Sequence, residues 1–214
     1  RPVKLRPQGA LKALAAASNP SDVTGYKLAP VDVAGELGRA KEALGAIPIT
    51  EVGSAEPCTL NTLIDKLRSG CDILYLAAHG TMAESGPRVW LQKEDGSAAI
   101  TSAEEIVTRI RELQNPPRLV VLASCQSAGD GKPNKDAGRV LQAFGPGLAQ
   151  AGIPAVVAMQ GNISMDSVKK FLPVFFSELQ KDGQIDRALA VARGTIRDAH
   201  DFWMPVLFMR LRSG

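Results

Sequence analysis

The sequence has few cysteines, few aromatic side chains and little net charge, and each shortage excludes a class of protein. Its 214 residues include three cysteines, Cys58, Cys71 and Cys125, an odd number that does not suit a disulfide framework. No two of them form a CxxC pair, and only two histidines are present, which argues against a structural zinc site. A reducing, cytoplasmic setting fits this use of cysteine.

Strong charge and long apolar runs are lacking as well. The 25 basic and 22 acidic residues leave a net charge of +3, scattered along the chain and without the basic stripe of a nucleic-acid-binding protein. No window approaches the roughly 18 consecutive apolar residues of a transmembrane helix. We therefore expect no direct contact with nucleic acid and no membrane span. The chain starts at Arg1 with no apolar signal-peptide core, so we expect it to be a portion of a longer protein.

An ordinary apolar content, 45% of residues, indicates a globular chain. The length predicts a single domain over residues 1–214, without internal repeats. A chain of this size buries a core without help from a disulfide or a metal. No EF-hand pattern is present, and we expect no obligatory cofactor.

Short apolar runs alternate with stretches of helical spacing along the chain. The runs predict buried strands over residues 11–17, 47–52, 72–78, 118–123, 154–159 and 205–211. The helical spacing and its capping residues predict helices over 33–44, 59–68, 102–113, 137–151, 167–181 and 185–197. Asp95-Gly96 predicts a hairpin between 89–91 and 98–100, and the polar loop 128–135 is a candidate mobile or cleavable segment. The alternation predicts an α/β fold with a mostly parallel sheet and helices on both faces.

Two of the predicted strands end in reactive side chains, and ligands of parallel sheets bind beyond the carboxyl ends of the strands. One strand ends in LYLAAHG and places His79 at this edge, and another ends in VVLASC and places Cys125 there. If the two strands are neighbours, an imidazole lies beside a thiol whose unperturbed pKa of roughly 8.5 leaves it mostly protonated. The imidazole can accept the thiol proton and later return it to a leaving amine.

Gly80 follows the histidine and has no side chain to block a substrate carbonyl. The backbone N–H groups of Gly80 and Cys125 are therefore candidates for an oxyanion hole. The ordinary explanations stay open, since a His-Gly pair is often a turn and a cysteine after a strand is often a buried apolar residue. We expect Cys58, Cys71 and His200 to have no part in the chemistry.

Four blocks of sequence, in order, are similar to one family. LYLAAHG, LVVLASCQSA, FGPGLAQAGIPAVVAMQ and DRALAVARGTIRD with WMPVLFM resemble the CHAT domain, a caspase-like family of cysteine peptidases related to caspases, separases and gingipains. The resemblance extends from about residue 19 to residue 211. It implies a caspase-like three-layer α/β/α sandwich, with His79 as general base, Cys125 as nucleophile and the N–H groups of Gly80 and Cys125 as oxyanion hole.

The resemblance also implies partners. These are a protein substrate and a regulatory region or activator protein, commonly built of TPR-like repeats, and some relatives serve bacterial immune systems. Asp166 and Gln160 follow the strand over 154–159, where the wall of the substrate pocket is expected.

An aspartate in that wall selects a basic residue before the cut, because a buried carboxylate needs a cation. Asp166 has a second explanation, as the cap of a helix beginning at Ser167. Asp72 is a weaker candidate for the same pocket, and a pocket without charge favours leucine or methionine.

Two other functions remain open. The chain could be an inactive caspase-like module that binds a peptide or a partner protein at the same edge. A small-molecule hydrolase or a nucleotide-binding domain ranks last, because the sequence has no Walker loop, no GxGxxG opening a helix and no GxSxG elbow.

Overall fold

A six-stranded sheet forms the centre of the computed structural model, which describes residues 9–123, 137–159 and 163–210, and no side chains within 137–143. The strand order is β2-β1-β3-β7-β8-β9. The strands are β1 (Ala13–Ala17), β2 (Ile49–Val52), β3 (Ile73–Ala77), β7 (Leu119–Ala123), β8 (Ala155–Met159) and β9 (Pro205–Met209). The first five run parallel and β9 runs antiparallel to β8, which confirms the mostly parallel sheet predicted from the sequence.

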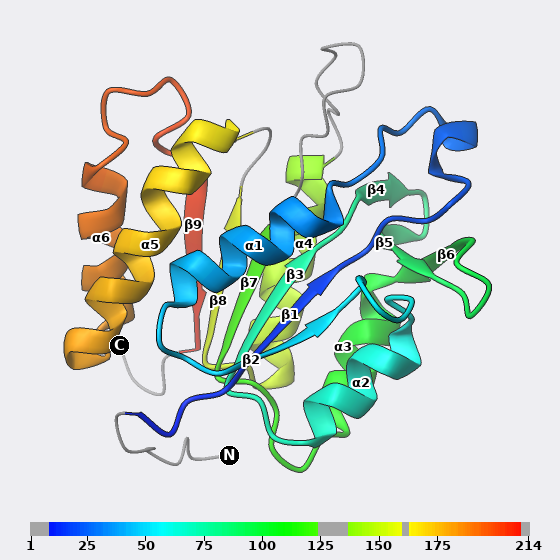
Figure 1. Cartoon of the computed structure of the whole chain (residues 1–214), viewed down its shortest axis with the longest axis horizontal. Helices are drawn as coiled ribbons and strands as arrows, with labels where there is room; N and C mark the ends of the chain where they lie inside the picture. Colours follow the sequence, from blue (N-terminus) through cyan, green and yellow to red (C-terminus); the bar gives the residue numbers. More distant parts are fainter. Residues whose placement is uncertain (1–8, 124–136, 160–162, 211–214) are drawn as a thin grey trace.

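Helices cover both faces of this sheet, as Figure 1 shows. The helices α1 (Val33–Leu44), α5 (Met165–Asp182) and α6 (Ile185–Gly194) form one layer, in which α1 and α6 each pack against α5. The other layer holds α2 (Leu60–Arg68), α3 (Ala103–Arg111) and α4 (Ala137–Ala151), in which α3 contacts both α2 and α4. Every residue of β1, β3, β7 and β8 is buried, because these strands are covered from both sides. The result is the expected three-layer α/β/α sandwich.

The helix boundaries follow the local capping chemistry. The Asp32 side chain accepts a hydrogen bond from the Gly35 N–H and starts α1 at Val33, and Gly45 with φ 59° ends it, as the sequence predicted. The helix predicted to begin at Ser167 begins at Met165 instead, because Ser164 is the capping residue and accepts from the Ser167 N–H at 3.2 Å. The last predicted helix ends at Gly194 rather than Arg197.

A small antiparallel sheet of β4 (Gly80–Ala83), β5 (Gly86–Gln92) and β6 (Ala98–Ser102) follows β3. The β5–β6 pair is the hairpin predicted at Asp95-Gly96, with Trp90 opposite Ile100. The strand β4 was not predicted, because its four residues form no apolar run and the strand exists by pairing with β5. A 3-10 turn, η1 (Val23–Tyr26), lies between β1 and α1.

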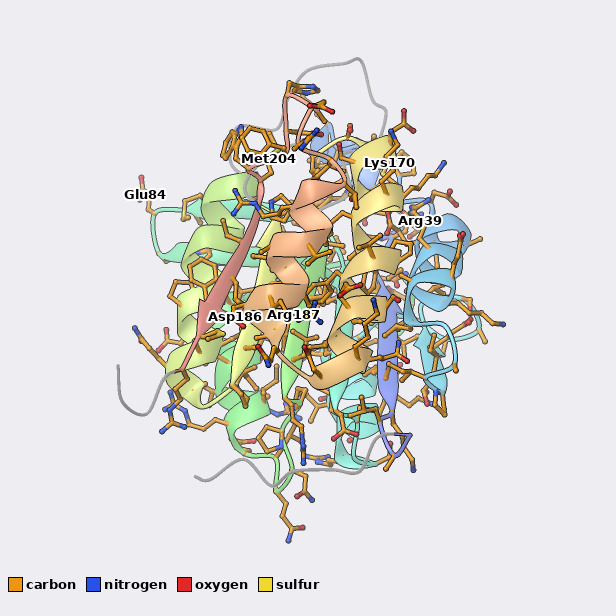
Figure 2. All side chains as sticks on the ribbon, turned by 90° about the vertical axis from the view of Figure 1, so that its left-hand side faces the viewer. Arg39, Glu84, Lys170, Asp186, Arg187 and Met204 are labelled. Atoms are coloured by element: carbon orange, nitrogen blue, oxygen red, sulfur yellow. The ribbon has the colours of Figure 1, made fainter. Side chains whose placement is uncertain are left out.

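Figure 2 shows α5 and α6 side by side, with Arg187 near the start of α6 and Met204 at the opposite end, before β9. The Arg187 guanidinium joins the two helices through ion pairs of 2.6 Å to Glu178 and 2.7 Å to Asp182. None of the helices in the described part of the chain is long and apolar enough to cross a membrane.

Candidate active site

The carboxyl edge of the sheet brings together the two strands that lead to His79 and Cys125. Strands β3 and β7 are parallel neighbours, and Ala77 is the register partner of Ala123. His79 and Cys125 each follow two residues later in the sequence, so the condition stated for an imidazole beside a thiol, that the two strands are neighbours, is met. Cys125, Gln160 and the loop 128–135 lie outside the described residues, and their roles stay predictions.

His79 is a buried histidine with one ring nitrogen held by the backbone. Its residue exposure is 4%, and Nε2 lies 2.8 Å from the carbonyl oxygen of Ala29. A carbonyl only accepts hydrogen bonds, so Nε2 carries the proton and Nδ1 keeps its lone pair. Burial lowers the pKa of His79 below its usual value, opposed in part by the bond to Ala29. The ring is therefore neutral at pH 7 and can act as a base through Nδ1.

Ala29 is a contributor to the site that the sequence analysis missed. Its side chain carries no chemistry, and a backbone carbonyl can come from any residue type, so no motif signals it. The segment around Ala29 is tied down by Asn19, whose Oδ1 accepts from the Val31 N–H at 2.9 Å. The Asn19 carbonyl in turn accepts from the Gln92 side-chain amide at 3.2 Å, which connects this segment to β5.

Gly80 begins β4 and is the register partner of Val89. The Trp90 N–H donates to the His79 carbonyl at 2.9 Å, which makes His79 and Trp90 the hydrogen-bonded pair of the ladder. Because such pairs alternate, the Gly80 N–H points away from β5. This direction is compatible with the predicted oxyanion role, which itself stays a prediction.

A small hollow, open to solvent, lies against His79. Apart from His79 itself, only glycine and apolar residues form its wall: Leu76, Ala78, Gly80, Val89, Leu122, Ala123 and Phe144. No described carboxylate borders this hollow, so the described part of its wall suits an apolar group.

The two aspartates considered for substrate recognition lie in different places. Asp166 is exposed in the first turn of α5, where its charge is favourable for the helix dipole. The prediction that Asp166 caps this helix is wrong, because Ser164 does so. Asp72 is buried at the opposite edge of the sheet, and its carboxylate accepts from the Lys12 N–H at 3.2 Å and lies 3.3 Å from Arg118 Nε.

Asp201 is a second residue that the sequence analysis did not single out. It is fully buried, and its carboxylate accepts from the Ser164 N–H and the Ser167 hydroxyl, each at 2.6 Å. Burial raises the pKa of Asp201, but these hydrogen bonds outweigh it and hold the pKa below its usual value. Asp201 therefore fixes the start of α5 against the chain that leads into β9. No sequence pattern marks an aspartate that caps a helix more than thirty residues away.

The remaining residues of reactive type are Cys58, Cys71 and His200. Cys58 is buried, and burial raises the pKa of its thiol to about 12. Burial also raises the pKa of Cys71, which precedes β3 at the amino edge of the sheet. His200 is exposed. Neither thiol is in an environment that favours the reactive thiolate.

Comparison with known proteins identifies the family and the fold of this chain. The family model described as CHAT domain matches residues 4–205. The Drosophila initiator caspase Dronc superposes with a TM-score of 0.53 and 11% identity, covering 95% of this chain and 81% of that chain. This likeness shows a caspase-like fold.

Two other similar structures have a TM-score of 0.48. Gingipain R (RgpB) of Porphyromonas gingivalis, an Arg-specific cysteine proteinase, is 12% identical, and the match covers 92% of this chain and 46% of that chain. The Saccharomyces cerevisiae separase–securin complex is 15% identical, with coverage of 94% and 12%. The chain therefore spans less than half the length of either. No curated protein matches it.

Proposed function

Because this chain belongs to the CHAT domain family, we propose that it is a cysteine endopeptidase with a dyad of His79 and Cys125. The observation that carries the proposal is the state of His79. Its ring is neutral, Nε2 is held by Ala29, and Nδ1 is left as a base at the end of β3. The neighbouring strand β7 leads to Cys125 two residues beyond its end.

The proposed reaction begins with transfer of the Cys125 thiol proton to His79 Nδ1. The thiolate sulfur then forms a bond to the scissile carbonyl carbon, and the N–H groups of Gly80 and Cys125 stabilise the negative oxygen. As the C–N bond breaks, the proton passes from His79 to the leaving amine. Water, deprotonated by His79, then hydrolyses the thioester and releases Cys125 with its proton.

Two specificities are candidates for the residue that precedes the cleaved bond. Asp166, with Gln160, supports recognition of arginine or lysine, whereas the apolar wall beside His79 supports leucine or methionine. Profiling with a peptide library distinguishes the two. Loss of the basic preference in Asp166→Ala supports the first, and an apolar preference that is unchanged in Asp166→Ala supports the second.

The proposed substrate is a specific protein, and a regulatory region or activator protein, of which TPR-like repeats are one form, controls the cut. Membership of the CHAT family supports this control, since its domains commonly sit behind such repeats. A role in bacterial defence or signalling belongs to the same proposal.

The test is cleavage of a peptide library, and of candidate proteins, by the full-length protein with its activator. We expect activity in the parent and none in Cys125→Ala or His79→Ala, with the fold retained in all three by circular dichroism. Equal cleavage by Cys125→Ala would eliminate the peptidase.

The alternative is an inactive module that binds a peptide at the same edge of the sheet. It predicts that a bound peptide is recovered intact and that Cys125→Ala binds it as tightly as the parent.

A further inference from the structure

Tyr26 is one of three exposed aromatic side chains in the chain, yet its ring makes a specific contact. It is 50% exposed at the end of η1, and its ring meets the buried Trp90 edge to face with centroids 4.7 Å apart. Because half of Tyr26 is exposed, burial of its ring contributes little to stability, and the contact with Trp90 can have a different role.

Two paths along the backbone, each ending in a hydrogen bond, lead from this ring contact to His79. On one side, the Trp90 N–H donates to the His79 carbonyl at 2.9 Å. On the other, Tyr26 precedes Ala29 by three residues, and the Ala29 carbonyl accepts from His79 Nε2 at 2.8 Å. The two paths therefore form a closed ring of contacts that runs from Tyr26 to Trp90, His79 and Ala29 and back along the chain to Tyr26. It holds both the backbone and the imidazole of His79.

The segment between Tyr26 and Ala29 is anchored on either side by hydrogen bonds, from the Lys27 N–H to the Thr24 carbonyl and from the Val31 N–H to Asn19, but Ala29 itself lies between these anchors. Lys27 has φ 60°, and it is the only residue other than glycine with a positive φ in the described ranges. This left-handed conformation is unfavourable for a residue with a side chain and persists where surrounding contacts impose it. Gly25, Lys27 and Pro30 are exposed, so packing against the core does little to fix this stretch.

The Trp90 ring is held by packing alone. Its Nε1 is buried without a hydrogen-bond partner, so no polar contact orients the indole. The ring of Tyr26 contacts the indole from the solvent side.

We propose that Tyr26 is a positioning residue for His79. Its ring, set against Trp90, holds residues 26–29 so that the Ala29 carbonyl stays on Nε2 and Nδ1 stays the proton acceptor. The inference rests on the proposed peptidase function for its purpose, but the geometry it describes can be measured without any activity.

The test uses nuclear magnetic resonance of ring-¹⁵N-labelled histidine in the full chain. Only His79 and His200 are present, and the exposed His200 exchanges its ring proton rapidly with water. We expect a protected Nε2–H signal from His79 in the parent and its loss, with a mixed tautomer, in Tyr26→Ala. Tyr26→Phe keeps the ring contact and should keep the signal.

Three further variants separate positioning from general loss of structure. Lys27→Val disfavours the left-handed turn and should lose the Nε2–H signal, whereas Lys27→Gly should keep it. Phe202→Ala removes another exposed aromatic ring, outside the closed ring of contacts, and should leave the signal unchanged.

The NMR signal tests the positioning role, and peptide cleavage tests the peptidase function on which its purpose depends. A protected signal in Tyr26→Ala, or its absence from the parent, would overturn the inference. If the parent cleaves peptides, we expect kcat to fall about tenfold or more in Tyr26→Ala with KM little changed, and recovery in Tyr26→Phe. If nothing is cleaved but the signal follows the predicted pattern, the positioning role stands and the peptidase proposal fails.

Discussion

The two edges of the central sheet differ in how their polar groups are satisfied. At the amino edge, the buried Asp72 joins three strands. Its carboxylate accepts from the Lys12 N–H before β1 and pairs with Arg118 before β7, and its carbonyl accepts from the Arg118 and Leu119 N–H groups at 2.7 and 3.1 Å. The carboxylate and the carbonyl of Asp72 therefore both have hydrogen-bond or ion-pair partners.

At the carboxyl edge, some polar groups of the described residues have no partner. In that part of the chain, the Ser18 hydroxyl, just beyond β1, and Trp90 Nε1 are buried without hydrogen-bond partners. His79 is buried in its neutral form, an apolar hollow adjoins it, and Lys27 is left-handed. Unsatisfied buried polar groups and unfavourable backbone conformations of this kind occur mainly where function requires them. The comparison indicates that the amino edge supplies stability, and it supports the chemistry proposed for the carboxyl edge.

The largest expected effect is on activity at the carboxyl edge. Replacing His79 with alanine removes the base, which typically contributes 10²- to 10⁴-fold, so we expect kcat/KM to fall by about that factor. The melting temperature should change much less than in an Asp72 variant. Peptide cleavage and thermal unfolding measure the two quantities. A rate within a few-fold of the parent would remove His79 from the mechanism.

The next effect is on stability at the amino edge. Asp72→Ala leaves the partly buried Arg118 without its carboxylate and the Lys12 N–H without its acceptor, so we expect the free energy of unfolding to fall by about 2 kcal/mol. Urea denaturation measures this, and Lys66→Ala, which removes an exposed ion pair with Glu56, is the matched control with little change. A large loss of kcat in the folded Asp72 variant would contradict the assignment of stability to the amino edge and of chemistry to the carboxyl edge.

A smaller effect of opposite sign is expected at Ser18. Its hydroxyl is buried and unpartnered, so Ser18→Ala removes an unsatisfied polar group and should stabilise the fold by up to about 1 kcal/mol. The backbone bond from the Ser18 N–H to the Ala77 carbonyl is unaffected. The melting temperature reports the change, and destabilisation would show that the hydroxyl has an essential contact.

The smallest effect is the pH dependence that His79 gives to stability. Its pKa is lower in the folded chain than the unfolded value of 6.5, so the unfolded chain binds the proton more readily. The stabilisation is complete above pH 6.5 and is lost as the pH falls from 6.5 toward the lower folded pKa. Between about pH 7.5 and about pH 5.5 the parent should lose more unfolding free energy than His79→Gln. Parallel curves would show that burial does not disfavour the imidazolium.

Most of the fold was accessible from the sequence because its signals are local. The apolar run after Cys71 gave β3, and Asp32 and Gly45 gave both ends of α1. The strand β4 was missed because it depends on pairing with β5. The start of α5 was misplaced by two residues because Ser164 competes with Asp166 as a cap.

The site was only partly accessible for a similar reason. His79 was found because a reactive side chain at a strand end is visible in the sequence. Ala29 and Asp201 were not, since a carbonyl has no signature and a cap from a distant segment depends on the tertiary fold. Tyr26 could not be singled out until its ring was seen against Trp90.

The most direct test of the central claim is modification of the thiols by a peptide-based electrophile, followed by mass spectrometry. The account predicts that Cys125 reacts much faster than the buried Cys58 and Cys71, and that this excess disappears in His79→Ala. Equal, slow labelling of all three thiols, or labelling of Cys125 that is indifferent to His79, would contradict it.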